Sequence, residues 1–389
     1  MHNELHQRVK EGFLAEYSAP PQVVTRAPGR LEILGNHTDY NEGLVLSAAV
    51  DRAMYVAASA RQNGTTSRVR DLRDNSSREF DVNAVGEAQP GDWANYIKGV
   101  VLALQKRGFQ VPQFDACVLS SIPLAAGMSS SAAFEISIAY ALGTLTEADL
   151  PWIEYARIGQ EAENNYVGAR TGLLDQFSSI KGQHSGLVYS DFRSLQVTNV
   201  PIPEGTALVV ANSMVKHNLT GDYNERRERC EEAVAFLQQR ADGIQALRDV
   251  NSGLLEQWRN KMDITTYRRA LHIVTENERV QAGVEALKSN DVAAFGRLLF
   301  ESHESSRLNF ENSCQELDIL VDLGKSLPGS LGARLSGGGF GGISVHLVEE
   351  SEAETYRERL ETAYRSRTGK TPQTMICHAD KGAQVLETA

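Results

Sequence analysis

Hydrophobic and polar positions follow patterns along the chain that predict where helices and strands lie. Residues 1–18 are typical of an amphipathic helix, which the SAPP segment ends. Residues 22–60 contain two apolar runs typical of strands, one on each side of a polar segment. The chain is therefore predicted to open with a helix followed by strands.

Both patterns continue through the rest of the first half. Residues 91–108 place apolar side chains three and four positions apart before a glycine, which predicts a helix. Further helices are predicted within residues 128–145 and 150–168, and strands within residues 114–127, 186–202 and 206–213. This half is predicted to be a mixed α/β structure.

The pattern changes after about residue 215. Three long, charged segments with helical periodicity follow, within residues 222–241, 265–289 and 291–307. A glycine-rich turn then leads into a strand whose apolar residues alternate, and a helix and a last strand at residues 372–379 close the chain. We therefore expect two lobes, an α/β lobe at residues 1–205 and an α+β lobe at residues 206–389.

Composition narrows the class of protein. The chain has 389 residues, of which 41% are hydrophobic and 23% charged, as in a soluble globular protein. Its net charge of −11 argues against a general nucleic-acid binder, because such proteins depend on Lys and Arg contacts to phosphates. The four cysteines are far apart, which disfavours a disulfide framework or a zinc site. With no signal-peptide pattern and no membrane-length apolar run, we expect a cytoplasmic protein that binds no membrane.

The segment PLAAGMSSSAAFE, residues 123–135, carries the strongest local signal. A glycine-containing turn delivers three serines to the predicted start of a helix. Free backbone N–H groups and a partial positive charge at a helix start suit a phosphate. A serine-rich N-cap without a ligand is the alternative.

Two glycine-containing segments resemble nucleotide motifs only superficially. YRSRTGKT has Tyr364 where a Walker A loop needs its first glycine. SGGGFGG, residues 336–342, contains GxGxxG, but it leads into a strand and not a helix, which excludes a dinucleotide fingerprint. A tight turn, or close approach of its backbone to a ligand or another loop, explains its five glycines.

Several polar residues stand in apolar surroundings. Asn36, His37 and Asp39 crowd between two glycines in LEILGNHTDYNEG, residues 31–43. RTGLLDQFSS places Arg170 and Asp175 around the Gly172 turn, where Asp175 is a candidate base or an N-cap. Other candidates are ordinarily solvated surface residues: Glu163, Lys216, His217, Arg226 and Arg227. The ordinary role of Tyr223 is that of a hydrophobic staple residue.

Taken together, these motifs resemble the GHMP small-molecule kinases and, within them, the galactokinase family. The similarity runs from about residue 20 to the end of the chain and keeps the family's motif order. The resembling segments are GRLEILGNHTDYNEG, WANYIKGV, PLAAGMSSSAAFE, GLLDQ, RRALHIVTENERV, SCQELDILV and GARLSGGGFGG. The resemblance implies a ribosomal-S5-like N-terminal lobe and a ferredoxin-like C-terminal lobe, with ATP and sugar meeting between them.

The resemblance also implies a role for each matching residue. Asp175 would orient or deprotonate the C1 hydroxyl of galactose, and Arg30 would stabilise charge and keep Asp175 ionised. Ser131 and Glu163 would hold Mg²⁺. Residues Gly127, Ser129, Ser130 and Ser131 would surround the phosphates, and Trp93 would contact adenine. Asn36, His37, Asp39, Gly172 and Tyr223 would line the sugar pocket. The implied product is galactose 1-phosphate, since phosphoryl transfer depends mainly on positioning and charge stabilisation.

Three departures from the family pattern leave the substrate open. Galactokinases usually carry Glu, which contacts the sugar's C6 hydroxyl, where this chain has Asn36. They usually carry His at Asn164, and two acids at Leu308 and Asn309. Neutral Asn36 would tolerate a C6 carboxylate, so a kinase for galacturonate or N-acetylgalactosamine is the alternative. A non-catalytic sugar sensor is a second alternative, which the undamaged serine loop disfavours.

Overall fold

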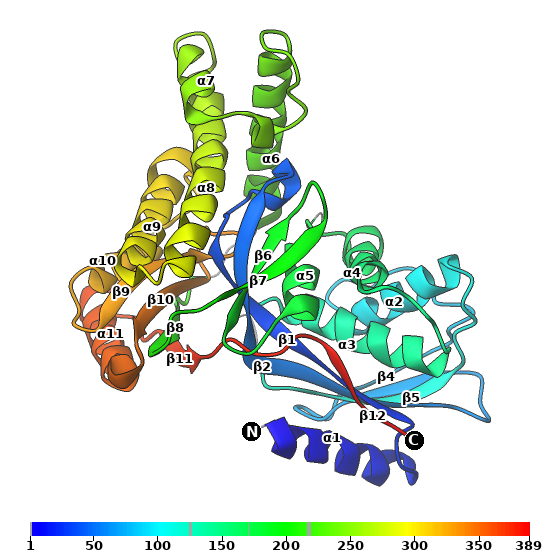
Figure 1. Cartoon of the computed structure of the whole chain (residues 1–389). Coiled ribbons are helices and arrows are strands. Elements are labelled where there is room, and N and C mark those ends of the chain that lie inside the picture. The colour runs from blue at the N-terminus through cyan, green and yellow to red at the C-terminus, as the bar shows by residue number, and fades with distance from the viewer. Residues whose placement is uncertain (1, 124–126, 170, 216–218) are drawn as a thin grey trace.

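A computed structural model describes residues 2–123, 127–169, 171–215 and 219–389, with the side chains of residues 219–221 excepted. Two β-sheets lie side by side, and a helical projection rises from the junction between them (Figure 1). The first sheet has eight strands in the order β12-β1-β2-β5-β3-β4, with β6 paired to β2 and β7 to β6. Its strands are β1 (Val23–Leu34), β2 (Leu44–Ala60), β3 (Ser67–Asp71), β4 (Ser77–Phe80), β5 (Phe114–Ser120), β6 (Gly186–Asp191), β7 (Gln196–Pro201) and β12 (Gln384–Thr388).

Helices cover both faces of this sheet. Alternate residues of β2 point to opposite faces, as the strand period requires. Tyr55 and Ala57 pack against α1 (His2–Tyr17) on one face, while Met54 and Val56 join the main core on the other. The main-core face is covered by α2 (Ala94–Lys106), α3 (Ser130–Leu145), α4 (Trp152–Glu161) and α5 (Leu174–Lys181), as Figure 1 shows.

The second sheet has four antiparallel strands in the order β11-β8-β10-β9. They are β8 (Thr206–Asn212), β9 (Ser330–Ser336), β10 (Ile343–Glu349) and β11 (Gln373–Cys377). Helices α10 (Gln315–Gly324) and α11 (Ala353–Thr368) cover one face with a core of leucines and tyrosines. The other face packs on α9 (Val292–Ser305) and shares the main core with the first sheet.

Strand β10 is buried on both faces. Ile343, Val345 and Leu347 enter the main core as the alternation predicts. The opposite face is buried too, because His346 bonds there to the hydroxyl groups of Ser344 (2.8 Å) and Tyr356 (2.7 Å). Polar residues on this strand are therefore satisfied inside the protein and do not mark a solvent face.

Three helices build the projection: α6 (Leu219–Gln238), α7 (Ser252–Gln257) and α8 (Ile264–Lys288). A separate hydrophobic cluster joins them, in which Leu237, Leu255 and Ile273 are fully buried. The far end of α8 continues down to the sheets and packs beside α9, so this one helix connects the projection to the body.

Most predicted elements are present, but several observed elements had no prediction. These are helices α5, α7 and α10, strand β9, the β3–β4 hairpin and strand β12. Strand β12 pairs antiparallel with β1 (Val23 opposite Thr388). The division between residues 205 and 206 stays a prediction: β7 and β8 lie in different sheets on either side of it, but β12 returns to the first sheet. In the part of the chain that the structure describes, no helix combines the length and apolarity needed to cross a membrane.

Close packing of α9 on β9 gives a test of the fold. A Cβ added at Gly296 would lie 1.8 Å from the carbonyl oxygen of Leu331, and backbone cannot move aside cheaply. We expect Gly296→Ala to lower the free energy of unfolding by about 1–3 kcal/mol, as measured by thermal denaturation. Gly186→Ala is the matched control, because its nearest neighbour would lie 3.6 Å away. Equal melting temperatures for the two variants would contradict this packing.

Candidate active site

Two cavities meet at the junction of the sheets. The first, of about 250 Å³, is smaller than the cavities of about 300 Å³ and more that hold drug-sized ligands, and so suits a small ligand. The second, of about 270 Å³, lies along the serine loop and the glycine-rich turn. Four residues border both cavities: Arg30, Asp175, Gly337 and Gly338. A ligand in one cavity can therefore contact a ligand in the other only beside these residues.

Asp175 lies at this junction, in the first turn of α5, and three bonds hold its surroundings. Arg30 Nε donates to its Oδ1 (2.7 Å), and Ser129 Oγ donates to its Oδ2 (2.5 Å). Arg30 also donates to the carbonyl oxygen of Gly127 (2.9 Å). Burial alone would lower the pKa of Arg30, but the carboxylates of Asp175 and Glu32 raise it, so its guanidinium stays charged.

The serine loop enters α3 as the sequence predicts. Ser129 is the N-cap residue and adopts a left-handed conformation (φ 51°), while Ser130 and Ser131 open the helix. All three line the second cavity together with Gly127, which is also left-handed (φ 65°). The start of a helix therefore faces this cavity, which is the arrangement that binds anions. Residues 124–126 of the same motif lie outside the described residues.

Ser131 and Glu163 are in contact, as the proposed metal pair requires. Ser131 Oγ donates to Glu163 Oε1 (3.0 Å), and Thr171 Oγ1 donates to Oε2 (3.0 Å). Burial raises the pKa of Glu163, and the Asp175 carboxylate adds to that effect. No group of three or more His, Cys, Asp or Glu side chains poised for a metal occurs among the described residues. One carboxylate and one hydroxyl nevertheless form an oxygen donor set that fits Mg²⁺, which usually keeps waters and phosphate oxygens as its other ligands.

The signature segment that follows β1 is anchored from the other lobe. Glu276 of α8 accepts from the backbone N–H groups of Gly35 (2.9 Å) and Asn36 (3.3 Å). Burial would raise the pKa of Glu276, but Arg279 and Arg334 lower it, so the anchor is a carboxylate. The glycine-rich turn closes over the same segment, since Gly337 and Gly338 offer carbonyl oxygens to Asn36 and His37. The turn's backbone thus approaches another loop closely, as one of the two interpretations predicted.

Asn36 borders the first cavity, but its amide is occupied within the protein. Its Nδ2 donates to Glu32 Oε1 (2.8 Å) and to the carbonyl oxygen of Gly337 (2.8 Å). Its Oδ1 accepts from Asn312 Nδ2 (2.9 Å) and lies 3.5 Å from Ser306 Oγ. The residue is 1% exposed. An amide has two N–H groups and two lone pairs, so these contacts use all of them.

His37 also uses both of its ring nitrogens internally. Nε2 lies 3.1 Å from the carbonyl oxygen of Gly338, and Nδ1 lies 2.9 Å from the hydroxyl of Tyr40. Burial lowers its pKa to about 4, so the ring is neutral at pH 7. Its ring packs 5.0 Å from that of Tyr223 of α6, which lines the same cavity. The two rings therefore form a wall, and a role for His37 as a hydrogen-bond partner of a ligand stays a prediction.

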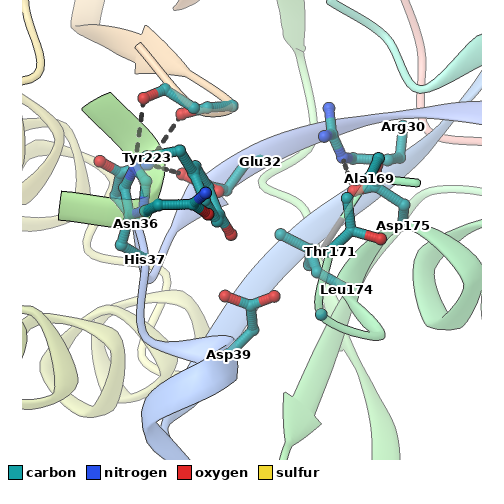
Figure 2. A pocket seen from close by; sticks show the side chains of 14 residues that line it. Arg30, Glu32, Asn36, His37, Asp39, Ala169, Thr171, Leu174, Asp175 and Tyr223 are labelled. Atoms are coloured by element: carbon teal, nitrogen blue, oxygen red, sulfur yellow. Dashed lines mark hydrogen bonds and ion pairs between the residues drawn. The ribbon is translucent and has the colours of Figure 1, made fainter. Parts of the chain in front are cut away.

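Asp39 points its carboxylate into the middle of the first cavity (Figure 2). Gly172 makes room for it, because a Cβ at Gly172 would lie within 1.8 Å of Asp39 Oδ2. Burial raises the pKa of Asp39 to about 7, and the nearby carboxylates of Glu32 and Asp175 add to the effect. Gly172 and Asp39, which come from distant segments, thus form one surface of the cavity.

Sequence reasoning missed several lining residues. The first cavity is also bordered by Glu32, Ala169, Thr171, Leu174, Asn224, Gly337 and Gly338. Glu32 could have been found, because residues two apart on a strand share a face and Arg30 was already a candidate. Trp93 lines neither cavity; it precedes α2 and its ring packs 6.1 Å from that of Phe134. Its predicted contact with adenine stays a prediction.

The other departures from the family pattern, Asn164, Leu308 and Asn309, do not line the first cavity. Asn164 exchanges hydrogen bonds with the backbone of Thr171 (3.0 and 3.1 Å) and so holds the loop before Asp175. Leu308 and Asn309 line neither cavity and border a separate surface groove. Arg170, Lys216 and His217 lie outside the described residues.

Comparison with known proteins assigns the family. The galactokinase galactose-binding signature matches residues 11–60, which contain Arg30 and the whole anchored segment. The N-terminal domain of GHMP kinases matches residues 95–183, and their C-terminal domain matches residues 284–366. A protein named galactokinase from Roseiflexus sp. (strain RS-1) is 39% identical over 385 residues, covering 98% of this chain and 97% of the relative. The chain belongs to the galactokinase family.

Solved structures agree with this assignment. The crystal structure of Lactococcus lactis galactokinase complexed with galactose is 29% identical, with a TM-score of 0.91 and coverage of 97% of this chain and 98% of that one. Mevalonate kinase from Methanococcus jannaschii is 17% identical, with a TM-score of 0.65 over 92% of this chain and 98% of its own, which shows the shared fold alone. The two-lobed GHMP kinase fold expected from the sequence is confirmed, as is a sugar kinase of this family, for which ATP is the implied co-substrate.

The pKa of Asp39 predicts how stability depends on pH. The folded-state pKa of Asp39 is about 7, against 3.8 for the free side chain. Between these two pH values, the folded protein therefore holds a proton that the unfolded chain has lost. Stability contributed by Asp39 is therefore lost as the pH rises from about 4 to about 7. We expect Asp39→Asn to be more stable than the parent at about pH 8, by on the order of 1–2 kcal/mol because the group is partly exposed.

Melting temperatures of both proteins across this pH range measure the effect. The difference between them should be small at about pH 4 and grow toward about pH 8. Asp242→Asn, at an exposed position, is the control and should follow the parent at every pH. A constant difference between Asp39→Asn and the parent would show that the carboxylate is not the cause.

Proposed function

We propose that this protein transfers the γ-phosphoryl group of ATP to the C1 hydroxyl of galactose, forming galactose 1-phosphate. The observation that carries the proposal is the place of Asp175, whose carboxylate borders both cavities and is bound by Arg30 and Ser129. The names of the relatives support galactose as the sugar and do not favour the alternatives galacturonate and N-acetylgalactosamine.

In this proposal the first cavity holds the sugar and the second holds the phosphates of ATP. The start of α3 and residues 127–131 surround the phosphates with N–H groups, hydroxyls and a partial positive charge. Asp39 and Gly172 form one surface of the sugar site, and the rings of His37 and Tyr223 form another. The C1 hydroxyl then lies beside Asp175, where the two cavities meet.

Asp175 orients the C1 hydroxyl and accepts its proton as the oxygen attacks the γ-phosphorus. Arg30 has two tasks, since its Nε holds Asp175 and its positive charge stabilises the negative charge of the transferring group. Ser129 limits the rotation of the carboxylate by binding its second oxygen. Positioning by these fixed groups supplies most of the rate enhancement that phosphoryl transfer needs.

Ser131 and Glu163 are the residues that would hold Mg²⁺. The ion, when bound, neutralises charge on the phosphates. Trp93 would contact the adenine ring beyond the second cavity. A cytoplasmic location of the protein stays a prediction. The non-catalytic sensor is disfavoured because Asp175, Arg30 and the serine loop are all in place.

Asp175→Asn tests the proposed chemistry. The amide keeps the shape of the side chain but cannot accept the hydroxyl proton, so we expect turnover of galactose to fall by about 10²–10⁴-fold. The galactose dissociation constant, measured by calorimetry, should change only a few-fold. ADP release in a coupled assay measures turnover, and the parent protein must release ADP with galactose and ATP.

Asp115→Asn is the matched control, because Asp115 pairs with Arg68 on the first sheet and borders neither cavity. It should retain parental turnover. Full turnover by Asp175→Asn would remove Asp175 from the role of proton acceptor. A parent that binds galactose without releasing ADP would indicate the sensor.

A further inference from the structure

Asn36, the side chain expected to contact the edge of the sugar opposite C1, has no free hydrogen-bonding group. Asn36 stands where the family pattern implies a sugar-contacting Glu, but both hydrogen-bonding groups of its amide are bound to protein atoms. His37 has no free ring nitrogen either. A sugar in the first cavity therefore needs a different hydrogen-bond acceptor at this end, because unpaired hydroxyls in a closed site weaken binding.

Glu32 is the side chain left with an unused acceptor there. It lies two residues after Arg30 on β1, borders the first cavity, and is 3% exposed. Its Oε1 accepts from Asn36 Nδ2 (2.8 Å) and pairs with Arg334 (3.1 Å). Its Oε2 accepts no hydrogen bond from any side chain or backbone group that the structure describes.

Glu32 and Asn36 also lie at the correct end of the cavity. Figure 2 shows them with Tyr223 on one side of the cavity, while Arg30 and Asp175 lie on the other. A sugar whose C1 hydroxyl meets Asp175 must direct the opposite edge of its ring toward Glu32. This placement rests on the proposed function, which orients C1 toward Asp175.

We propose that Glu32 is a specificity-determining residue that accepts a hydrogen bond, through Oε2, from a galactose hydroxyl remote from C1. Charge-assisted hydrogen bonds are stronger than neutral ones, and a site built around one strongly rejects an analogue that lacks the hydroxyl. Asn36 is a positioning residue, because its Nδ2 binds the other oxygen and keeps Oε2 toward the sugar.

The same carboxylate determines which sugars are excluded. Glu32, Asp39 and Asp175 all border the first cavity, and Arg30 is the cation among its described lining residues. Arg334 is fully buried behind Glu32 and does not line the cavity. A C6 carboxylate would therefore meet carboxyl groups that repel it when they are ionised, so galacturonate is disfavoured even though Asn36 itself is neutral.

Glu32→Gln is the decisive variant because its geometry is constrained. Asn36 Nδ2 and Arg334 are both donors, so they keep the glutamine carbonyl oxygen on their side. The NH₂ group then faces the cavity, and a donor replaces the acceptor. We expect the KM for galactose to rise by about 10- to 100-fold, with a smaller change in kcat.

Deoxygenated sugars locate the contact. In the parent, removal of the contacted hydroxyl, tested with 4-deoxygalactose and 6-deoxygalactose, should raise KM by about 10- to 100-fold. In Glu32→Gln the same removal should cost much less, because the acceptor is already lost. The ratio of kcat/KM for galacturonate to that for galactose should rise in the variant. Glu154→Gln is the matched control, since Glu154 pairs with Arg107 outside both cavities.

Asn36→Glu provides an independent arm. It would place a second carboxylate where Asn36 Nδ2 now lies 2.8 Å from Glu32 Oε1, so we expect a lower melting temperature and weaker turnover. The double variant Glu32→Gln with Asn36→Glu should recover both, because one carboxylate and one amide are restored with their positions exchanged.

The outcomes separate the two proposals. If the parent does not phosphorylate galactose, the proposed function fails. If the parent is active but Glu32→Gln raises KM for galactose and both deoxy sugars by one common factor, or leaves KM unchanged, the role of Glu32 is overturned. Failure of the double variant to recover the stability lost in Asn36→Glu would overturn the exchange between the two positions.

Discussion

The two lobes and the first cavity depend on one buried guanidinium. Arg334 of β9 is fully buried and lies 3.1 Å from Glu32 of β1 and 3.8 Å from Glu276 of α8. It also donates to the carbonyl oxygen of Ile33. Loss of one partner from such a buried group costs about 3–5 kcal/mol, because a charge is left without compensation. The same charge therefore joins the sheets, holds the signature segment through Glu276, and orients the Glu32 carboxylate that borders the first cavity.

Around this arginine, polar side chains either use all their hydrogen-bonding groups within the protein or keep some of them available at the first cavity. Asn36 and His37 belong to the first class, since their bonds tie β1 to the glycine-rich turn. Asp39 belongs to the second: burial raises its pKa to about 7, and the carboxylates of Glu32 and Asp175 add to the effect. A protein accepts such an unfavourable group where function requires it. A ligand hydroxyl can donate a further hydrogen bond to this carboxylate, so binding would offset part of the cost of its burial.

Contiguous motifs made much of the site predictable from the sequence. The serine loop, its helix and the contact between Ser131 and Glu163 follow from local chemistry and the family pattern. What could not be predicted is which polar groups remain free, because two of the partners of Asn36 lie 276 and 301 positions away. Asn312 and Gly337 occupy its amide, and no local pattern indicates such pairings. The alternation of side chains along β1 could have indicated Glu32 as a lining residue. Its importance, however, depends on the same distant contacts.

Strand β12 has a consequence for how the protein is made. Its residues, Gln384–Thr388, complete the first sheet by pairing with β1, which begins at Val23. The ribosome makes these residues long after β1, so the edge of β1 stays open while the segments between the two strands emerge. An open edge is a template for pairing with other strands. Until β12 has emerged, the nascent chain must therefore keep this edge from pairing with other polypeptides.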